Sequence, residues 1–329
     1  MFAMSRTRGC ILTAVLLLPG GTVLADDGVS LAPKFEAGTR HHYVSRSIVR
    51  HGIAAELLET KQEVTVRTES GMAIVVASVS SNGEAELEWT THYMKLSTDG
   101  AIPGIDAALD YDSRVPAPST SPLAPTFASI IGKPFHIRVS RSGDILSFET
   151  PQIYAGPDAV SQLAQSFFSK EAFAQLPLFV TLGAPAKVNY RDAWQRREEI
   201  AFPLGGTNLE LLESFTCARR KPRRQSVRLN MTGTISAVSA GPQAVNGLDP
   251  LQGAALTVES GTVKGEYEWD YAYGRLLAAE SQLDLVTALN TRVGRMQLEQ
   301  HLTGSVALVD ERAFERKVRA PHRTKRGGR

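Results

Sequence analysis

Residues 72–96, with the sequence MAIVVASVSSNGEAELEWTTHYMKL, contain the pattern that decides the fold. The first part of this stretch is apolar on both sides of a two-residue alternation, which predicts a strand covered on both faces. Asn82-Gly83 follows, and this pair supplies the two positive-φ residues that a tight hairpin turn needs. From Ala85 to Tyr93, apolar and polar residues alternate again. We therefore expect an antiparallel hairpin over residues 72–96.

A second hairpin is predicted further along the chain. Phe135–Val139 and Ile145–Phe148 flank the turn residues Ser142-Gly143-Asp144. Between the two hairpins, Ser113–Pro125 contains four prolines, which remove four backbone donors. We expect this segment to be an ordered connector and not a strand.

The strand pattern resumes after residue 190. An aromatic run, Tyr267–Tyr273, leads into a turn at Gly274-Arg275, and strands are expected over Leu276–Leu289 and Met296–Val309. Both halves of the chain share an aromatic-rich strand, a glycine turn and a strand that opens with paired apolar residues. This common order favours an internal duplication.

Only one stretch has the pattern of a helix. Asp158 can cap its first turn, an apolar stripe follows, and Pro177 ends it after about Gln175. We therefore predict a mostly antiparallel β protein (α+β), with two related curved β-sheets or half-barrels and one connecting helix near residues 158–176. The expected units are a signal peptide (1–25), a first β-rich half (26–157), the connecting helix and turn (158–182), a second β-rich half (183–311) and a basic disordered tail (312–329).

The first 25 residues have the features of an export signal. Arg6 and Arg8 precede a short apolar run, Ile11–Leu18, and Val23-Leu24-Ala25 places small side chains at a cleavage site. The apolar run is too short for a membrane anchor, which needs about 20 helical residues. We expect a soluble mature protein that starts at Asp26, in the periplasm or outside the cell.

The charge differs between the body of the chain and its last residues. Residues 312–329 carry eight basic residues against Glu315, so this tail has a charge of +7 and residues 26–311 have −7. The tail has few apolar residues, and we expect it to be mobile, either merely solvated or attached to an anionic lipid or polymer. Without the leader, Cys217 is the only cysteine, so no internal disulfide is possible.

Several motifs in residues 109–194 resemble those of a protein family. They are Tyr111-Asp112-Ser113, Ile131-Gly132-Lys133-Pro134-Phe135, Ser142-Gly143-Asp144-Ile145-Leu146, Phe167-Phe168-Ser169, Leu176-Pro177 and Asp192-Ala193-Trp194. In this order they resemble an uncharacterised family of exported bacterial β-rich proteins, and the likeness spans roughly residues 35–310. It implies a fold and a compartment but no activity. Arg191 stands where the family pattern has glycine, so the local turn is expected to differ.

No sequence motif of a known catalytic chemistry is present. The nucleophile elbow, the zinc-protease helix, paired cysteines, the dinucleotide loop and the phosphate loop are all absent. Cys217 has Arg219 and Arg220 nearby, which could lower its pKa, but a buried, unreactive thiol is the preferred interpretation. Glu198-Glu199 is rejected as an acid/base pair because neighbouring strand side chains point apart.

Metal binding is also not expected, and we predict no cofactor. Asp106, Asp110 and Asp112 lack the spacing of a calcium loop, so they are expected to shape turns. At most one of His41 and His42 could face His51, because adjacent histidines on a strand point to opposite faces.

Two groups of residues are candidate contact sites. The run Arg219, Arg220, Lys221, Arg223 and Arg224 is expected in a hairpin loop, either simply solvated or in contact with an envelope polyanion or anionic lipid. We do not expect nucleic acid, since no aromatic residue interleaves with this run. A second group consists of Trp89 and a row of four aromatic residues, Tyr267, Trp269, Tyr271 and Tyr273, which are expected on one face of one strand. This group could line a groove for a glycan or an apolar ligand, although a core position is favoured.

These patterns favour a non-catalytic function. We expect an exported binding or structural protein of the bacterial cell envelope. A carrier that holds a lipid or another apolar molecule inside a curved sheet is the alternative, and an enzyme without a recognisable motif comes third.

Overall fold

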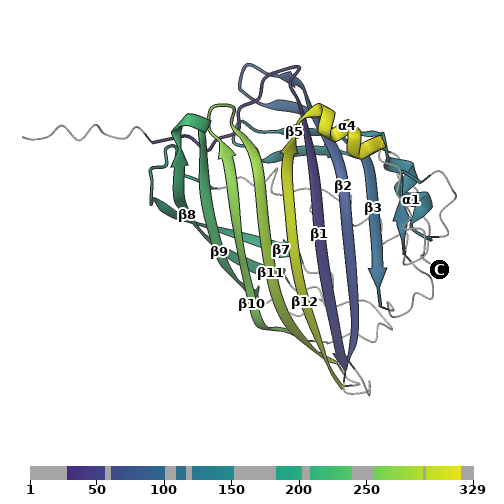
Figure 1. Ribbon diagram of the computed structural model, residues 1–329. Coiled ribbons are helices and arrows are strands. Elements are labelled where there is room, and N and C mark those ends of the chain that lie inside the picture. The colour runs from purple at the N-terminus through teal and green to yellow at the C-terminus, as the bar shows by residue number, and fades with distance from the viewer. Residues whose placement is uncertain are drawn as a thin grey trace, which may run out of the picture.

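The computed structural model describes residues 28–55, 61–100, 109–115, 121–151, 183–201, 208–238, 255–291 and 294–319. Its strands are β1 (Arg40–Ala55), β2 (Gln62–Val79), β3 (Ala85–Asp99), β4 (Tyr111–Asp112), β5 (Pro134–Val139), β6 (Ile145–Glu149), β7 (Ala193–Ala201), β8 (Asn208–Lys221), β9 (Ser226–Val238), β10 (Ala255–Asp270), β11 (Arg275–Thr291) and β12 (Gly294–Val309). Its helices are α1 (Ala124–Ile130), a short 3-10 helix η1 (Pro222–Arg224) and α4 (Glu311–Arg319). The predicted mostly antiparallel β class is confirmed (Figure 1).

All of these strands belong to one continuous sheet of 12 strands. Its order is β6-β5-β3-β2-β1-β12-β11-β10-β9-β8-β7, with β4 beside β3. The two expected sheets are thus joined edge to edge, since β1 pairs with β12 from His42 opposite Val309 to Ala55 opposite Met296. This junction removes two edges that would otherwise expose unpaired backbone groups.

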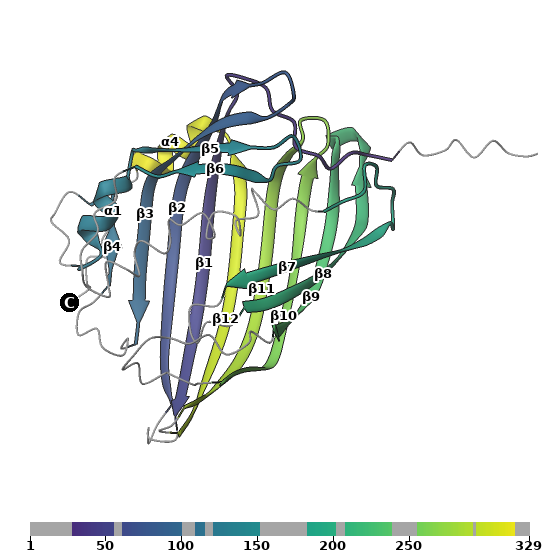
Figure 2. The same cartoon turned by 180° about the vertical axis from the view of Figure 1, so that it is seen from behind.

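The sheet bends into a half-barrel whose two ends curl toward the same side. In Figure 2, β5 and β6 cross in front of the upper part of the middle strands, and β7 crosses in front of β11 and β12. We call the hollow side the inner face and the opposite side the outer face. The end that carries the β8–β9 and β10–β11 turns, at the top of Figure 1, is called the upper end.

The hairpin predicted for residues 72–96 is confirmed as β2 and β3. Its turn differs from the prediction, because only Gly83 has a positive φ, of 86°, and Asn82 does not. The loop spans five residues, closed by a hydrogen bond from the Ser80 N–H to the Glu84 carbonyl oxygen at 2.8 Å. The Asn82 carboxamide oxygen accepts the Glu84 N–H, at 3.2 Å, which favours this wider loop.

The core lies on the inner face of the sheet. Leu87 and Trp89 of β3 are buried there, while Glu86 and Glu88, which alternate with them, point to the outer face. In the other half, Phe215 of β8 is fully buried, and its ring stacks on that of Trp194, with 5.5 Å between the centroids. Strands from both halves therefore contribute to one core.

The connector between the first two hairpins is partly helical. Its described residues contain no strand after β4, as predicted, but Ala124–Ile130 forms the unpredicted helix α1, with proline in its first turn. Phe127 and Ile130 of this helix are completely buried. The helix predicted for residues 158–176 lies outside the described residues. Within the described ranges, no helix is long and apolar enough to cross a membrane.

The expectation of a disordered tail is wrong for residues 312–319. They belong to α4, which packs on the outer face of β1 and β2 (Figure 1). Phe314 is buried, and its ring centroid lies 4.6 Å from that of His42. The helix closes over Gly71, where a Cβ atom would come within 3.0 Å of the Phe314 ring. One buried aromatic side chain thus orders a segment whose overall composition predicts mobility.

The turn before β7 contains a residue in an unusual backbone conformation. Arg191, expected to change the local turn, has a φ of 70°, the left-handed conformation that favours glycine. This conformation costs a side-chain-bearing residue about 1–2 kcal/mol relative to glycine.

Replacement of Phe314 should release α4 from the sheet. Phe314→Ala is expected to lower the free energy of unfolding by about 3–5 kcal/mol, because it leaves a cavity over Gly71 and His42. Urea unfolding followed by fluorescence would measure the change. The matched variant Glu315→Ala, on the exposed side of the same helix, should shift the midpoint little. Equal shifts in the two variants would contradict the anchoring role of Phe314.

Candidate functional site

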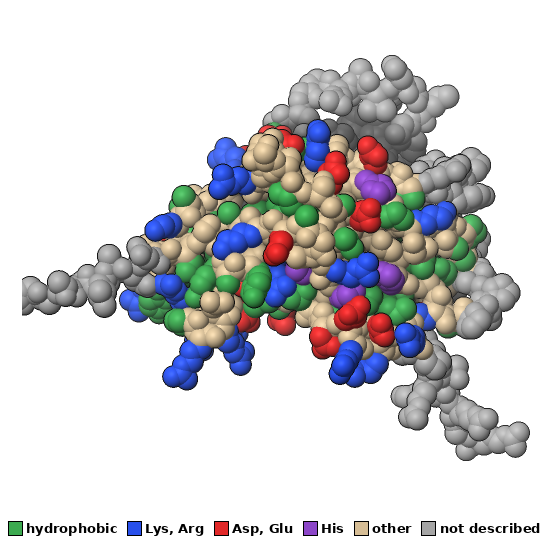
Figure 3. All heavy atoms as spheres, turned by 90° about the horizontal axis from the view of Figure 1, so that it is seen from above, with side chains coloured by type: hydrophobic (Ala, Val, Ile, Leu, Met, Phe, Trp, Pro, Cys, Tyr) green, Lys and Arg blue, Asp and Glu red, His purple; other side chains and the backbone are tan. Residues whose placement is uncertain are grey.

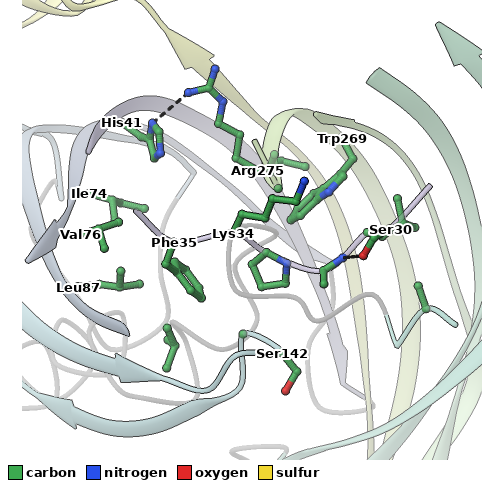
Figure 4. Close-up of a pocket in the computed structure, with 18 of the residues that line it drawn as sticks. Ser30, Lys34, Phe35, His41, Ile74, Val76, Leu87, Ser142, Trp269 and Arg275 are labelled. Atoms are coloured by element: carbon green, nitrogen blue, oxygen red, sulfur yellow. Dashed lines mark hydrogen bonds between the residues drawn. The ribbon is translucent and has the colours of Figure 1, made fainter. Parts of the chain in front are cut away.

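A pocket of about 220 Å³ opens on the inner face near the upper end of the sheet (Figure 4). Ile74 and Val76 of β2 and Leu87 of β3 line one side, and Trp269 of β10 lines the other. β3 and β10 are separated by four strands in the sheet. Curvature therefore brings together side chains that a flat sheet would keep far apart.

The segment before β1 forms a wall of the pocket. Ser30–Phe35 runs across the mouth, between the middle strands and the β5–β6 loop (Figure 4). Val29 and Val188 hold this segment through two backbone hydrogen bonds of 2.9 Å. At the other side, the Lys34 N–H donates to the Gly274 carbonyl oxygen at 3.2 Å. A Cβ atom on Gly274 would lie 2.4 Å from the Lys34 nitrogen, so only glycine permits this approach.

The walls are mainly apolar and the charged groups at the mouth are cationic. Lys34 and Arg275 line the pocket, and the described residues of its lining include no aspartate or glutamate. The Lys34 ammonium donates to the carbonyl oxygens of Tyr271 and Ala272 at 3.0 and 2.9 Å, so uncharged backbone groups hold it in place. Burial, followed by the nearby Arg275, lowers the pKa of His41 and favours its neutral form. An apolar ligand with an anionic or polar end suits this arrangement.

The size of the pocket limits what it can hold. A cavity of about 150 Å³ is enough for a benzene ring, whereas sites for whole drug-sized ligands start near 300 Å³. At about 220 Å³, this pocket suits a ring or a segment of an acyl chain.

The aromatic residues predicted as ligand contacts do not form one surface. Trp89, Tyr267 and Trp269 are buried in the core, and only Trp269 borders the pocket. β10 ends at Asp270, so Tyr271 and Tyr273 lie in the following turn and not on the face of the strand. The predicted row of four aromatic side chains on one strand face is therefore wrong. The core interpretation is confirmed for Tyr267 and Trp269.

The five basic residues at the end of β8 and in the following turn also separate into two groups. Lys221 pairs with Glu268, with 2.8 Å between the ammonium and the carboxylate, and Arg220 packs 5.6 Å above the Tyr271 ring. Arg219, Arg223 and Arg224 are exposed. The predicted loop position is correct for Arg223 and Arg224 but wrong for Arg219, Arg220 and Lys221, which belong to β8. The exposed charge comes from three residues rather than five.

Other candidate groups have structural roles. Cys217 is 1% exposed and burial raises its pKa, in agreement with the preferred interpretation of a buried thiol. Asp112 pairs with Arg114 at 2.9 Å, and Asp110 accepts the Thr98 N–H at 2.9 Å. Asp106 lies outside the described residues.

The histidines are not brought together as a metal site. His41 faces the pocket, whereas His42 packs on Phe314 at the outer face. His51 is ten positions further along β1 than His41. Among the described residues, no group of three or more histidine, cysteine, aspartate or glutamate side chains could hold a metal ion.

Sequence reasoning missed a buried ionic cluster on the inner face of β7 and β8. Arg196 binds Glu213 and also lies 2.9 Å from Glu198. The Glu213 side chain is 5% exposed, and burial raises its pKa although the Arg196 charge opposes this shift. The sequence does not reveal the contact between Glu213 and Arg196, because it depends on the β7–β8 register that places these two residues opposite one another.

Comparisons with known proteins give only distant likenesses. No family model matches the chain, and no curated protein matches it. A solved structure described as lipid-protein interactions in lipovitellin has a TM-score of 0.44 and 14% identity, over 84% of this chain and 26% of that chain. DynF from the dynemicin biosynthesis pathway of Micromonospora chersina has a TM-score of 0.21 and 8% identity, over 93% and 95% of the two chains.

A third likeness is weaker still. A DUF1329 family protein from Desulfovibrio piger has a TM-score of 0.14 and 9% identity, over 83% of this chain and 90% of that one. The chain spans about a quarter of the lipovitellin chain that it matches. Because all three scores are low, the function of the protein is inferred from the geometry of its own chain.

The buried carboxyl of Glu213 should make stability depend on pH. Its pKa is raised in the folded state, so folding is favoured while the group is protonated, and this contribution is lost as the pH rises above the ordinary value of 4.5. Glu213→Gln should therefore lose less stability than the wild type between mildly acidic and neutral pH. Urea unfolding across this range would measure it.

A matched control uses a carboxylate of the same strand. Glu210 lies on the outer face of β8 beside Arg197. Glu210→Gln should leave the pH dependence close to that of the wild type. If Glu213→Gln and the wild type show the same dependence, Glu213 does not titrate as its burial predicts.

Proposed function

We propose that the protein is an exported, non-catalytic binding protein of the cell envelope that holds an apolar molecule on the inner face of its half-barrel. The observation that carries this proposal is the pocket between β3 and β10, with apolar walls and a cationic mouth. Its polar groups are engaged in holding the fold. For example, the Tyr43 hydroxyl donates to the Leu276 carbonyl oxygen at 3.1 Å. Such an arrangement suits retention of a ligand more than its chemical conversion.

The inner face below the pocket adds apolar surface. One row of directly paired residues crosses five strands, from β2 to β10, and consists of Val66, Val49, Leu302, Leu283 and Val263. Four of these side chains are only partly buried, and Val263 is the exception. Partly exposed leucine and valine on a hollow face offer contact for an acyl chain.

The row above it consists of small residues. Thr68, Ser47, Gly304, Ser281 and Gly265 lie opposite one another on β2, β1, β12, β11 and β10. Their short side chains extend little from the sheet between the apolar row and the pocket. We therefore propose that an elongated ligand continues from the pocket toward the apolar row.

A ligand-binding assay tests the pocket directly. Titration with a fluorescent fatty acid should give saturable binding, which Val76→Phe should weaken by at least about tenfold because the larger ring takes up pocket space. Val75→Phe is the matched control, since Val75 precedes Val76 on β2 and is not among the lining residues. Equal affinity in the two variants, or no saturable binding by the wild type, would overturn the proposal.

Material purified from the native host gives an independent measurement. Native mass spectrometry of the wild type should show a bound lipid or other apolar molecule. Val76→Phe should carry less of it than Val75→Phe.

Export predicts the first residue of the mature protein. We expect N-terminal mass analysis of protein from the native host to find Asp26 at the start, because Val23-Leu24-Ala25 has the small residues of a cleavage site. Recovery of a cytosolic product that retains Met1 would contradict export. It would leave the ligand-binding proposal to be judged by its own assay.

A further inference from the structure

Exposed arginine and tyrosine side chains form a surface at the upper end, on the β8–β9 side of the pocket (Figure 3). We call this surface the basic rim, and it consists of Tyr190, Arg191, Arg219, Arg223, Arg224 and Tyr273. Figure 3 looks down on this end, and lysine and arginine side chains outnumber acidic ones in its left part, on the side of β8 and β9.

Hydrogen bonds between neighbouring turns hold the parts of the basic rim together. The Arg191 N–H donates to the Cys217 carbonyl oxygen at 2.8 Å, which places the turn before β7 beside the upper end of β8. The Tyr271 N–H donates to the Gln225 carbonyl oxygen at 3.0 Å, which joins the β8–β9 and β10–β11 turns. The rim is therefore one surface and not a set of independent loops.

The positive charge of the rim is not neutralised within the described part of the chain. Arg191, Arg219, Arg223 and Arg224 form no ion pair there. The nearby carboxylates already have partners. Glu268 pairs with Lys221 at 2.8 Å, and Asp270 lies 3.5 Å from Arg275. Anionic groups from outside are the natural counter-charges for these four arginines.

Two exposed tyrosines give the rim an apolar component. Tyr190 and Tyr273 are 51% and 60% exposed, and each ring lies under a guanidinium, that of Arg191 at 5.1 Å and that of Arg275 at 4.8 Å. Tyrosine is favoured at membrane–water interfaces, where its ring enters the apolar boundary and its hydroxyl stays hydrated. Arginine stacked on tyrosine can bind phosphate at the same depth.

The rim is continuous with the pocket. Tyr273 is followed directly by Gly274 and Arg275, which line the pocket mouth. A surface that touches the rim would therefore lie close to the opening.

We propose that the basic rim docks the protein on anionic phospholipid bilayers and sets the mouth of the pocket against the membrane surface. The docking itself is inferred from the basic rim alone. Its use for loading or delivering a ligand rests on the proposed ligand-binding function. Exposed tyrosines beside the cations favour a bilayer over a polysaccharide, since a hydrated polyanion offers no apolar layer for them.

Vesicle binding by the full chain tests the proposal. The wild type should bind vesicles of phosphatidylcholine that contain one third phosphatidylglycerol, in a salt-sensitive way, and should bind pure phosphatidylcholine weakly. The combined variant Arg219→Gln, Arg223→Gln and Arg224→Gln should lose about 100-fold in affinity, since each cation near an anionic surface contributes roughly fivefold. Its binding of the fluorescent fatty acid should remain that of the wild type.

A control variant removes the same charge elsewhere. Arg50, Arg67 and Lys264 are exposed and lie within strands β1, β2 and β10, away from the upper end. Their combined replacement by glutamine should change vesicle affinity by less than about threefold, the effect of overall charge alone. A loss equal to that of the rim variant would overturn the proposal.

Two further variants test whether the basic rim or another basic segment binds the vesicles, and whether the partner is a bilayer or a polyanion. Replacement of Arg323, Lys325, Arg326 and Arg329 by glutamine removes charge from the last residues of the chain, and vesicle binding that depends on these residues but not on the rim would overturn the proposal.

Tyr190→Ser with Tyr273→Ser should weaken binding to vesicles but not to dextran sulfate. Wild-type protein that binds dextran sulfate but not anionic vesicles would overturn the proposal and identify a polyanion as the partner.

Discussion

The pairing of β1 with β12 is the interaction on which the rest of the structure depends. It joins the first and last long strands of the chain, from His42 opposite Val309 to Ala55 opposite Met296. Without it, each half would be a shorter sheet with a long exposed edge of unpaired backbone groups. With it, twelve strands share one curvature, and the inner face becomes hollow enough to gather side chains from β3 and β10 around one pocket. The pocket is thus a property of the joined sheet and of neither half.

Segments outside the sheet complete the pocket and cover the outer face. The residues before β1 reach across the mouth, held by Val29 opposite Val188 and by the close approach of Lys34 to Gly274. On the other side of the sheet, α4 places Phe314 over a glycine of β2. In both places a glycine gives room to a neighbouring group. At Gly274 this is the Lys34 backbone, and at Gly71 it is chiefly the Tyr93 ring of β3, with Phe314 next to it. The same upper end carries the exposed arginines of the β8–β9 loop, so the apolar and charged features of the molecule lie side by side.

Much of the fold could be predicted because strands and hairpins leave local signals. Alternation and a glycine turn located the β2–β3, β5–β6 and β10–β11 hairpins, since each depends on residues close together in the chain. Less of the site could be predicted. Trp269 was recognised as a buried aromatic residue, but its position beside Ile74 and Leu87 depends on curvature that no local pattern encodes. Glu213 and Arg196 meet because of a strand register that is set by packing. The position of α4 depends on the burial of Phe314 against the sheet.

The amino-acid sequence by itself determined which segments are strands, where most of them turn, and which side chains avoid water, because these properties depend on the alternation of neighbouring residues. Only the tertiary structure decided that the two halves form one sheet, that the pocket lies between β3 and β10, and that three arginines of the basic run remain exposed. Those outcomes depend on pairing across hundreds of residues and on the competition of each charge for a partner in space. Lys221 shows the difference, since its sequence neighbours are all basic or proline, whereas the structure gives it the carboxylate of Glu268.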